Sequence, residues 1–394
     1  MTVNNKTATL AGKNQDLESA VKKRYAEGAK EREAELCCPV DYNPEYLKII
    51  PQEILDKDYG CGDPSKYLLK GDVVLDLGSG GGKICYIASQ IVGPEGKVIG
   101  VDFNPDMLAL AQKHRKTVSE AVGWSNVEFR KGKIQDLRTN LSYLDTLLKD
   151  RTVTSADDYL ALTGELQQCS KDNPLIADSS IDVIVSNCVL NLVQQQDKKQ
   201  LFNEMYRVLK KGGRVAISDI VSDEAVPQHL QDDTHLWSGC ISGAFQELDF
   251  LKAFEAAGFY GVEISKRDEK PWKVVEGIEF RSVTVTAWKG KEGPCIERNQ
   301  AVIYKGPWKQ VCDDDNHVFQ RGVRSAVCDK TFHLLQKEPY KNEFVAIEPY
   351  RTIPSESATQ FNCKAGAVRH PKVTKGEDYD ITTENEGCSG ESCC

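Results

Sequence analysis

The feature that most constrains the fold is an alternation of strand-like and helix-like segments that begins near residue 70. The series starts with the apolar run "DVVLDLGSGGG", which ends in glycines, and continues with "KICYIASQIV", whose apolar residues recur at helical spacing. Two further strand-like runs, "KVIGVDFN" and "VEFRKGKIQDL", flank the helical segment "PDMLALAQKHRKTVSEAV". Strands that alternate with helices predict an α/β fold with a mostly parallel sheet covered by helices on both faces.

The alternation is interrupted once and then continues to about residue 290. Residues 139–178 do not fit the rhythm, and we interpret them as an insertion with one or two helices. The series resumes with "IDVIVSNCVLNL", "DKKQLFNEMYRVLK" and "KGGRVAISDIV", and it ends with "LDFLKAFEAAGF", "GVEISKRDEK" and "FRSVTVTAWK". We therefore predict one large α/β domain over residues 70–290.

Three further segments flank this domain. Residues 1–69 are expected to form a polar helix over 16–35 and then a cysteine-containing cap of loops and short helices. Residues 291–376 contain short strand-like runs between turn residues, which predicts a small β-rich domain. Residues 377–394 are acidic and poor in large apolar residues, so we expect a mobile, cysteine-containing tail.

Charge and composition exclude several classes of protein. Lys and Arg total 50 against 59 Asp and Glu, a net charge of −9, which argues against a nucleic-acid partner. No window approaches the roughly 18 apolar residues of a membrane span, and the start of the chain lacks a signal-peptide pattern. We therefore expect a cytoplasmic protein. In such a reducing compartment, 14 cysteines favour metal binding, redox chemistry or capture of a soft ligand over disulfides.

The glycine-rich turn after the first strand favours a nucleotide-type ligand. Asp76 precedes glycines that let a ligand approach the backbone closely, and the next helix offers unpaired N–H groups. The spacing does not match the dinucleotide pattern G-x-G-x-x-G. Asp102 ends the next strand, where a carboxylate can accept hydrogen bonds from a ribose, and "GKIQDL" follows the third strand.

Together these motifs resemble class I S-adenosylmethionine-dependent methyltransferases over residues 71–221. The family's motif after the fourth strand is represented by "VLKKGGRVAISD". The alternative is an α/β domain that has lost its cofactor. The resemblance implies a cofactor site that runs from the methionine part (Asp76, Gly78 and Gly80) through the ribose (Asp102) to the adenine (Ile134 and Gln135), with Phe103, Met107 and Asn187 completing the set.

Three cysteines fall in segments that face the substrate in this class. Cys61 lies in "YGCGDP", Cys188 directly follows "VSN", and Cys240 lies in "WSGCISGA". A lone cysteine is often just a small buried apolar residue, and we assign Cys85 and Cys169 to that structural role. The combination at the substrate side is harder to explain by packing.

This combination resembles arsenite S-adenosylmethionine methyltransferases over residues 37–289. The shared marks are "YGCG", "SNCV" followed by "NL", and a Gly-Cys-hydrophobic segment with a nearby glycine. The resemblance implies that Cys61, Cys188 and Cys240 bind arsenic and that an additional N-terminal thiol comes from Cys37 or Cys38. The family more often has a cysteine inside the glycine loop, where this chain has "GSGGG".

Soft-ligand chemistry supports the same function. Trivalent arsenic is a soft, pyramidal acceptor, and thiolates are the soft ligands of proteins. Three thiolates leave the arsenic lone pair free to attack the methyl of the sulfonium, and no general base is needed. The predicted function is methyl transfer from S-adenosylmethionine to trivalent arsenic, supplied as arsenite or its thiol conjugate. Glutathione or a thioredoxin-type reductant would restore the cysteines.

Two other functions remain open at this point. One is methyl transfer to another soft acceptor, such as selenium, tellurium or a small thiol. The other, from a different class, is a metalloid-binding or redox protein built on a methyltransferase scaffold.

The remaining sulfur lies in the C-terminal part. A C-x4-H-x10-C-x4-H series lacks the tighter cysteine pair of zinc sites, so we interpret it as scattered domain residues: Cys312, His317, Cys328 and His333. The terminal "CSGESCC" either gathers soft ions and relays disulfides or is a passive tail.

Overall fold

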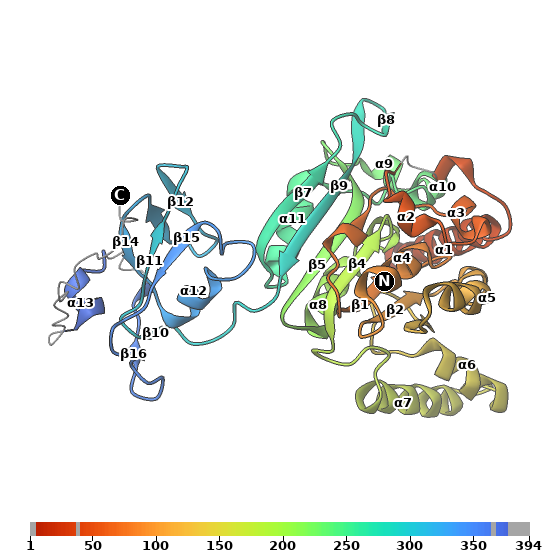
Figure 1. The fold of residues 1–394 in the computed structure, drawn as a ribbon. Helices are drawn as coiled ribbons and strands as arrows, with labels where there is room; N and C mark the ends of the chain where they lie inside the picture. The colour runs from red at the N-terminus through yellow and green to blue at the C-terminus, as the bar shows by residue number, and fades with distance from the viewer. Residues whose placement is uncertain (1–4, 37–39, 364–367, 377–394) are drawn as a thin grey trace. The chain divides into compact units, whose positions relative to one another are not determined.

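The structure is a computed structural model that describes residues 5–36, 40–363 and 368–376. The chain divides into two compact units, residues 1–290 and residues 291–394. Each unit is described by itself, with the elements labelled as in Figure 1.

The first unit is built on one sheet in the order β3-β2-β1-β4-β5-β9-β7, with β6 beside β5 and β8 beside β9. β1 to β5 run parallel, whereas β9 is antiparallel to its neighbours β5 and β7. The predicted mostly parallel α/β sheet is confirmed. Its strands are β1 (Val73–Leu77), β2 (Lys97–Asp102), β3 (Val127–Lys131), β4 (Ile181–Asn187), β5 (Leu209–Ser222), β6 (Phe245–Gln246), β7 (Tyr260–Arg267), β8 (Lys273–Val275) and β9 (Ile278–Trp288).

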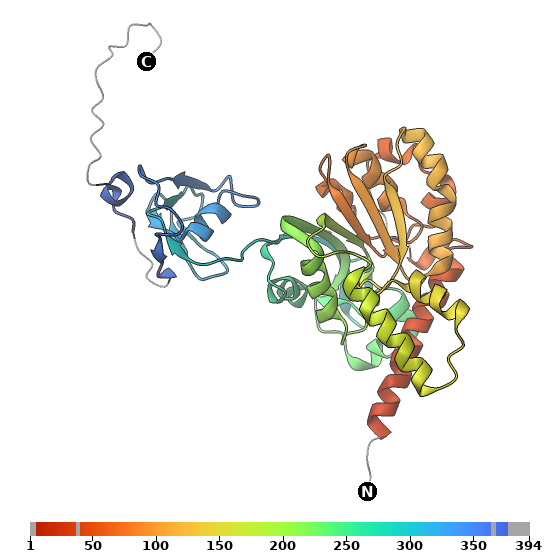
Figure 2. The same cartoon turned by 90° about the horizontal axis from the view of Figure 1, so that it is seen from below.

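Helices cover both faces of this sheet (Figures 1 and 2). The longer ones are α1 (Asn5–Gly28), α4 (Lys83–Val92), α5 (Pro105–Val122), α6 (Leu141–Asp150), α7 (Ala156–Asp172), α8 (Lys198–Val208) and α11 (Glu247–Ala256). The shorter ones are η1 (Ala34–Leu36), α2 (Pro44–Leu47), α3 (Gln52–Asp56), η2 (Pro64–Tyr67), η3 (Leu190–Leu192), α9 (Gln228–Gln231) and α10 (Thr234–Ser238).

The N-terminal helix differs from its predicted range of 16–35. α1 begins at Asn5 and ends at Gly28, where the Tyr59 hydroxyl donates a hydrogen bond of 2.9 Å to the Gly28 carbonyl. A Cβ at Gly28 would lie 3.0 Å from the Tyr59 ring, so glycine admits this close contact. The helix therefore stops where a residue distant in sequence packs against its last turn, which local sequence does not reveal.

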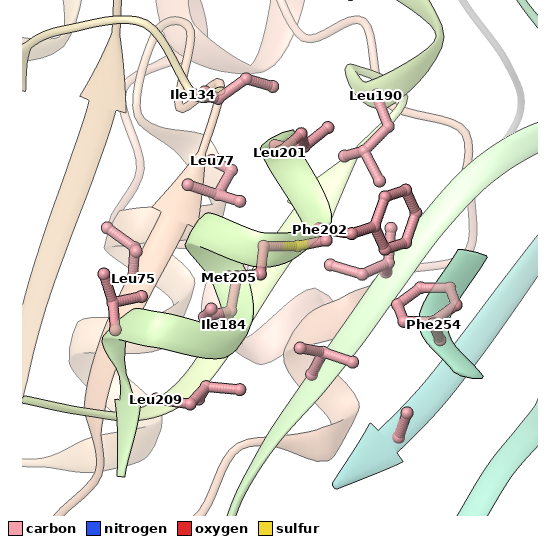
Figure 3. Packing of buried hydrophobic residues seen from close by; sticks show 14 of the residues in the cluster. Leu75, Leu77, Ile134, Ile184, Leu190, Leu201, Phe202, Met205, Leu209 and Phe254 are labelled. Carbon is pink, nitrogen blue, oxygen red and sulfur yellow. The ribbon is translucent and has the colours of Figure 1, made fainter. Parts of the chain in front are cut away.

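Successive residues of the central strands point to opposite faces of the sheet and pack into two hydrophobic cores, one on each face. Val74 packs into the core beneath α4 and α5, whereas Leu75 and Leu77 pack into the core beneath α8 and α11. Figure 3 shows Phe202 and Met205 of α8 lying over this second group. Because both faces of the sheet are buried, the sequences of its central strands are continuous apolar runs and do not alternate between apolar and polar residues.

The segment 139–178 contains two helices, α6 and α7, which contact each other. The Tyr143 hydroxyl of α6 donates to the Glu165 carboxylate of α7 at 3.1 Å. α7 begins with a capping box, in which the Ser155 side chain accepts from the Asp158 N–H and the Asp158 carboxylate accepts from the Ser155 N–H. This short-range signal fixes the start of the helix.

The strand order reverses next to β1, which lies between β2 and β4. In open parallel sheets a crevice forms outside the carboxyl ends of the strands at such a switch point. Asp76 lies near the carboxyl end of β1, and Cys188 directly follows β4. The fold therefore brings the two sequence-predicted regions to the same edge of the sheet.

Within its described residues, the second unit holds three small sheets and two short helices. β11 (Ala301–Tyr304) pairs antiparallel with β14 (Arg324–Ala326) and β15 (Phe344–Ile347), and its core includes Val302, Phe319 and Phe332. The remaining elements are β10 (Ile296–Glu297), β12 (Gln310–Cys312), β13 (Val318–Gln320), α12 (Asp329–Leu334), β16 (Thr359–Gln360) and α13 (Pro371–Lys375). The predicted β-rich character of this region is confirmed.

Candidate active site

A pocket opens at the carboxyl ends of β1 and β4. It holds about 1140 Å³ of empty space, part of which is open to solvent. Its lining includes every residue that the resemblance implied for the cofactor: Asp76, Gly78, Gly80, Asp102, Phe103, Met107, Ile134, Gln135 and Asn187. The structure thus gathers residues from four separate segments around one space at the carboxyl ends of the strands.

The turn after β1 requires glycine at two positions that line the pocket. Gly78 has φ of +73°, and a Cβ there would lie 2.4 Å from the Val189 side chain. Gly80 has φ of +50°, and its N–H donates to the Asp102 carboxylate at 2.9 Å. Backbone of this kind is accessible to glycine at little cost. The glycine turn therefore shapes the pocket and also tethers the acid at the end of β2.

Asp102 is a buried carboxylate held by backbone N–H groups. Besides Gly80, the Asn104 N–H donates to it at 2.8 Å. Burial raises the pKa of Asp102, while hydrogen bonds from the Asn104, Gly80 and Phe103 N–H groups oppose that shift. Backbone N–H groups therefore hold this carboxylate in a fixed orientation at the pocket.

Asp76 is buried beside a cysteine that we had assigned to packing. The Cys85 thiol of α4 donates to the Asp76 carboxylate at 3.2 Å. Burial raises the pKa of Asp76 to about 7; the Cys85 hydrogen bond lowers it and nearby Asp102 raises it further. Cys85 is fully buried, in keeping with packing, but its contact with a pocket acid was missed.

The loop that carries Cys61 is fixed by Asn187, the last residue of β4. The Asn187 side-chain oxygen accepts from the Cys61 N–H at 2.9 Å and from the Gly62 N–H at 3.0 Å. Its amide nitrogen donates to the Gly62 carbonyl at 2.8 Å and to the Tyr42 hydroxyl at 3.0 Å. Asn187 lines the pocket, but its amide is engaged by this loop, a role that the sequence did not suggest.

The two glycines beside Cys61 are explained by this docking. A Cβ at Gly60 would lie 2.1 Å from the Asn187 amide nitrogen, and a Cβ at Gly62 would lie 2.5 Å from the Ser218 hydroxyl. The motif "GCG" therefore permits the loop to pass directly over the end of β4 and over Ser218 within β5.

Two of the three predicted thiols meet at one place. The sulfurs of Cys61 and Cys188 and a carboxylate oxygen of Asp219 all lie within 4.8 Å of one another, and all three residues are buried. Cys188 also lines the cofactor pocket. The thiol cluster and the pocket are thus adjacent, with Cys188 belonging to both.

Cys240 belongs to the same buried cluster as Cys61 and Cys188, but its sulfur is not among the atoms that lie within 4.8 Å of one another. Its thiol donates to the Cys188 carbonyl at 3.1 Å, and the Tyr25 hydroxyl lies 3.9 Å from its sulfur. Cys188 and Cys240 have φ of +63° and +61°, backbone that is unusual for residues other than glycine. Such conformations concentrate at functional sites, where the surrounding structure holds them in place.

Asp219 is a member of this cluster that the sequence analysis did not single out. Its carboxylate accepts from the Leu190 N–H at 2.8 Å and from the Asn191 side-chain amide at 2.8 Å. Burial raises its pKa to about 6, and these hydrogen bonds together with Lys198 oppose the shift. A carboxyl that titrates near neutrality beside two thiols can exchange protons with them. Asp219 lies within β5, three residues before its last residue, in the segment "AISD".

The other predicted cysteines are placed as follows. Cys37 and Cys38, candidates for the additional thiol, lie outside the described residues. Cys169 is half-buried in α7. Within the described ranges, no helix is long and apolar enough to cross a membrane.

Comparisons with family models divide the chain at the same place as the two units. A model described as a methyltransferase domain matches residues 68–173 and 163–258. A model described as a domain of unknown function (DUF8838) matches residues 291–379.

Several characterised proteins are similar to this chain, and each is named arsenite methyltransferase. That of Aquipseudomonas alcaligenes is 35% identical over 277 residues, which cover 67% of this chain and 70% of the relative. That of Halobacterium salinarum is 37% identical, covering 54% of this chain and 44% of the relative. The human protein is 30% identical, covering 64% and 60% respectively.

A solved structure supports the same relationship. The arsenic(III) S-adenosylmethionine methyltransferase CrArsM of Chlamydomonas reinhardtii matches 82% of this chain and 100% of its own, with 27% identity and a TM-score of 0.54. The class I methyltransferase fold predicted from the sequence is confirmed. The chain therefore belongs to the arsenite methyltransferase family and is an S-adenosylmethionine-dependent methyltransferase.

Proposed function

We propose that this protein transfers a methyl group from S-adenosylmethionine to trivalent arsenic bound by Cys61, Cys188 and Cys240. The observation that carries the proposal is the position of Cys188. It lines the cofactor pocket, and its sulfur lies within 4.8 Å of the Cys61 sulfur. A soft acceptor bound there would lie next to the cofactor. The arsenite activity named for the relatives agrees with this arrangement.

Binding of arsenic exchanges oxygen for sulfur without a change in oxidation state. For arsenite, each As–S bond forms as an As–O bond breaks, and the thiol proton leaves with the hydroxyl as water. For a thiol conjugate, the incoming cysteine replaces the conjugated thiol, which leaves with the proton. Asp219, with a pKa of about 6, is placed to relay the proton of Cys61 or Cys188 to the departing hydroxyl or thiol during this exchange.

Cys240 completes the site by turning its thiol. In the structure this thiol donates to the Cys188 carbonyl at 3.1 Å, so a side-chain rotation releases it toward the other two sulfurs. The rotation costs one hydrogen bond, about 1 kcal/mol. An As–S bond more than replaces it.

Methyl transfer then depends mainly on position. The cofactor supplies a methyl group on a sulfonium, whose leaving group is a neutral thioether. The pocket acids would orient the bound cofactor and the cysteine sulfurs would hold arsenic, which would bring the arsenic and the methyl group together. Arsenic gives up two electrons as the As–C bond forms. Two glutathione molecules, or the two thiols of a thioredoxin-type protein, would return them as two sulfurs join in a disulfide and release two protons.

The proposal is tested by single serine variants of the three thiols. Cys188→Ser and Cys240→Ser should each abolish methylation of arsenite and of monomethylated arsenic, because serine offers a hard oxygen that binds arsenic poorly. Cys61→Ser should abolish the first reaction and spare the second, because a methylated arsenic needs only two sulfurs. Cys169→Ser, in α7, is the matched control. Near-normal arsenite turnover by Cys188→Ser would disprove the trithiolate site.

The two alternatives are separated in the same assay by offering labelled cofactor with selenite, tellurite and simple thiols. Products from one of these acceptors, and none from arsenite, would reassign the substrate. Cofactor binding without turnover on any acceptor would favour a metalloid-binding or redox protein.

A further inference from the structure

A second thiol cluster lies in the C-terminal unit. The sulfurs of Cys295, Cys328 and Cys363 all lie within 4.8 Å of one another, with Cys328 buried and the other two half-buried. None of the three is in a disulfide. In the sequence, Cys328 belongs to a spacing pattern with Cys312 and two histidines, which we interpreted as scattered domain residues. The structure places Cys328 with two other cysteines that no sequence motif connects to it.

The fold brings two of these cysteines together through a short ladder. β10 pairs antiparallel with β16, with Ile296 opposite Gln360. Cys295 directly precedes β10, and the next ladder bond runs from the Phe361 N–H to the Cys295 carbonyl at 2.9 Å. Cys363 follows two residues later. The ladder therefore holds segments 68 residues apart in sequence side by side.

The third sulfur is anchored by the start of α12. Cys328 is the N-cap of that helix, and its sulfur accepts from the Thr331 N–H at 3.4 Å and contacts the Thr331 hydroxyl at 3.2 Å. Arg298, just after β10, pairs with Asp329 of α12 at 2.8 Å. This ion pair ties the helix start to the ladder, so the cluster is supported by secondary structure on each side.

The number and kind of donors select the ligand. Among the residues that the structure describes, no histidine, carboxylate or fourth cysteine joins this group. Structural zinc sites are almost always four-coordinate, so three thiols fall one ligand short. Trivalent arsenic is soft and pyramidal, and it is saturated by three thiolates with its lone pair in the fourth direction.

We propose that Cys295, Cys328 and Cys363 form a second, non-catalytic binding site for trivalent arsenic. The three thiols belong to a unit with a hydrophobic core of its own, and the proposed site holds arsenic without a part in the methyl transfer proposed above. The site would take arsenite whether or not the first unit transfers methyl groups to arsenic.

Arsenite would bind at this site by the same exchange of oxygen for sulfur as at the first site. Arsenite loses three hydroxyls as three As–S bonds form, each thiol proton leaves in a water molecule, and arsenic stays trivalent.

The test is the arsenic content of the full-length protein after incubation with sodium arsenite and gel filtration, measured by mass spectrometry. Cys328→Ser and Cys363→Ser should each lose about one equivalent of arsenic per chain relative to the native protein. Cys312→Ser, an exposed cysteine of the same unit, should lose none. Serine is also a good N-cap, so Cys328→Ser should keep α12, which circular dichroism would check.

A second measurement separates this site from the first. In the variant Cys61→Ser/Cys188→Ser/Cys240→Ser, X-ray absorption at the arsenic edge should still report arsenic bound by three sulfurs, and adding Cys363→Ser should remove that signal. Unchanged arsenic content in both Cys328→Ser and Cys363→Ser would overturn the second site. So would zinc retained by these thiols with no uptake of arsenite. Absence of methyl transfer by the native protein, with arsenic still bound by Cys295, Cys328 and Cys363, would count only against the proposed function.

Discussion

Replacing Asn187 with alanine should weaken arsenite use much more than cofactor binding. The Asn187 side chain makes four hydrogen bonds, and its oxygen alone holds the Cys61 and Gly62 N–H groups. At about 0.5–1.5 kcal/mol for each of those two bonds, the docked loop loses about 1–3 kcal/mol. Because about 1.4 kcal/mol is a factor of ten, the apparent arsenite affinity should fall roughly 5- to 150-fold.

The assay is steady-state kinetics with arsenite and S-adenosylmethionine varied in turn, together with calorimetric binding of S-adenosylhomocysteine. The KM for arsenite should rise while cofactor affinity changes by less than a factor of about three, or roughly 0.6 kcal/mol. Asn126→Ala is the matched control, because Asn126 donates to the Gly93 and Gly96 carbonyls, outside the pocket lining. A larger loss of cofactor affinity than of arsenite affinity would refute the loop reasoning and assign Asn187 to the cofactor.

Three further outcomes are expected. Asp102→Ala should weaken S-adenosylmethionine binding by roughly 1.5–3 kcal/mol, since a charge-assisted bond to the ribose is lost, and unchanged affinity in calorimetry would contradict that role. Cofactor affinity should rise as pH increases through about 7, because Asp76 is neutral below its raised pKa and pairs with the ammonium of the cofactor only when ionised. If Asp76→Asn leaves the pH dependence of cofactor affinity unaltered, this acid is excluded as its cause. Truncation after Lys375 keeps Thr374, which accepts a 2.7 Å hydrogen bond from Arg324. The truncated chain should therefore keep the thermal unfolding temperature and the methyl transfer of the native protein. A truncated chain that no longer folds would show the tail to be structural.

The sheet and the cofactor pocket were predictable because their signals are local. The periodicity of each strand and helix can be read within about ten residues, and parallel strands place their carboxyl ends at one edge. Asp76 and Asp102 could therefore be assigned to a common site from strand ends alone. Their raised pKa values could not be predicted, since these depend on burial by α4 and neighbouring loops.

The features that sequence missed all depend on contacts between distant segments. The amide of Asn187 is engaged by a loop 125 residues earlier, and α1 ends where Tyr59 packs against it. Cys295 and Cys363 meet only because two very short strands pair. Strands of two residues carry no usable periodicity, so no pattern in the sequence marks this cluster.

The end of β4 relates the thiols of the first unit to the cofactor pocket. Cys188 follows it, and its N–H donates to the Ser218 carbonyl of β5 at 2.8 Å, so the sheet itself fixes its backbone. Cys61 is held by Asn187, the residue before, and the Cys240 thiol contacts the Cys188 carbonyl. Sites supported on strands are positioned more accurately than sites on loops. A disturbance at this strand end would move all three sulfurs relative to the methyl group, whereas a disturbance in any one loop would move a single sulfur.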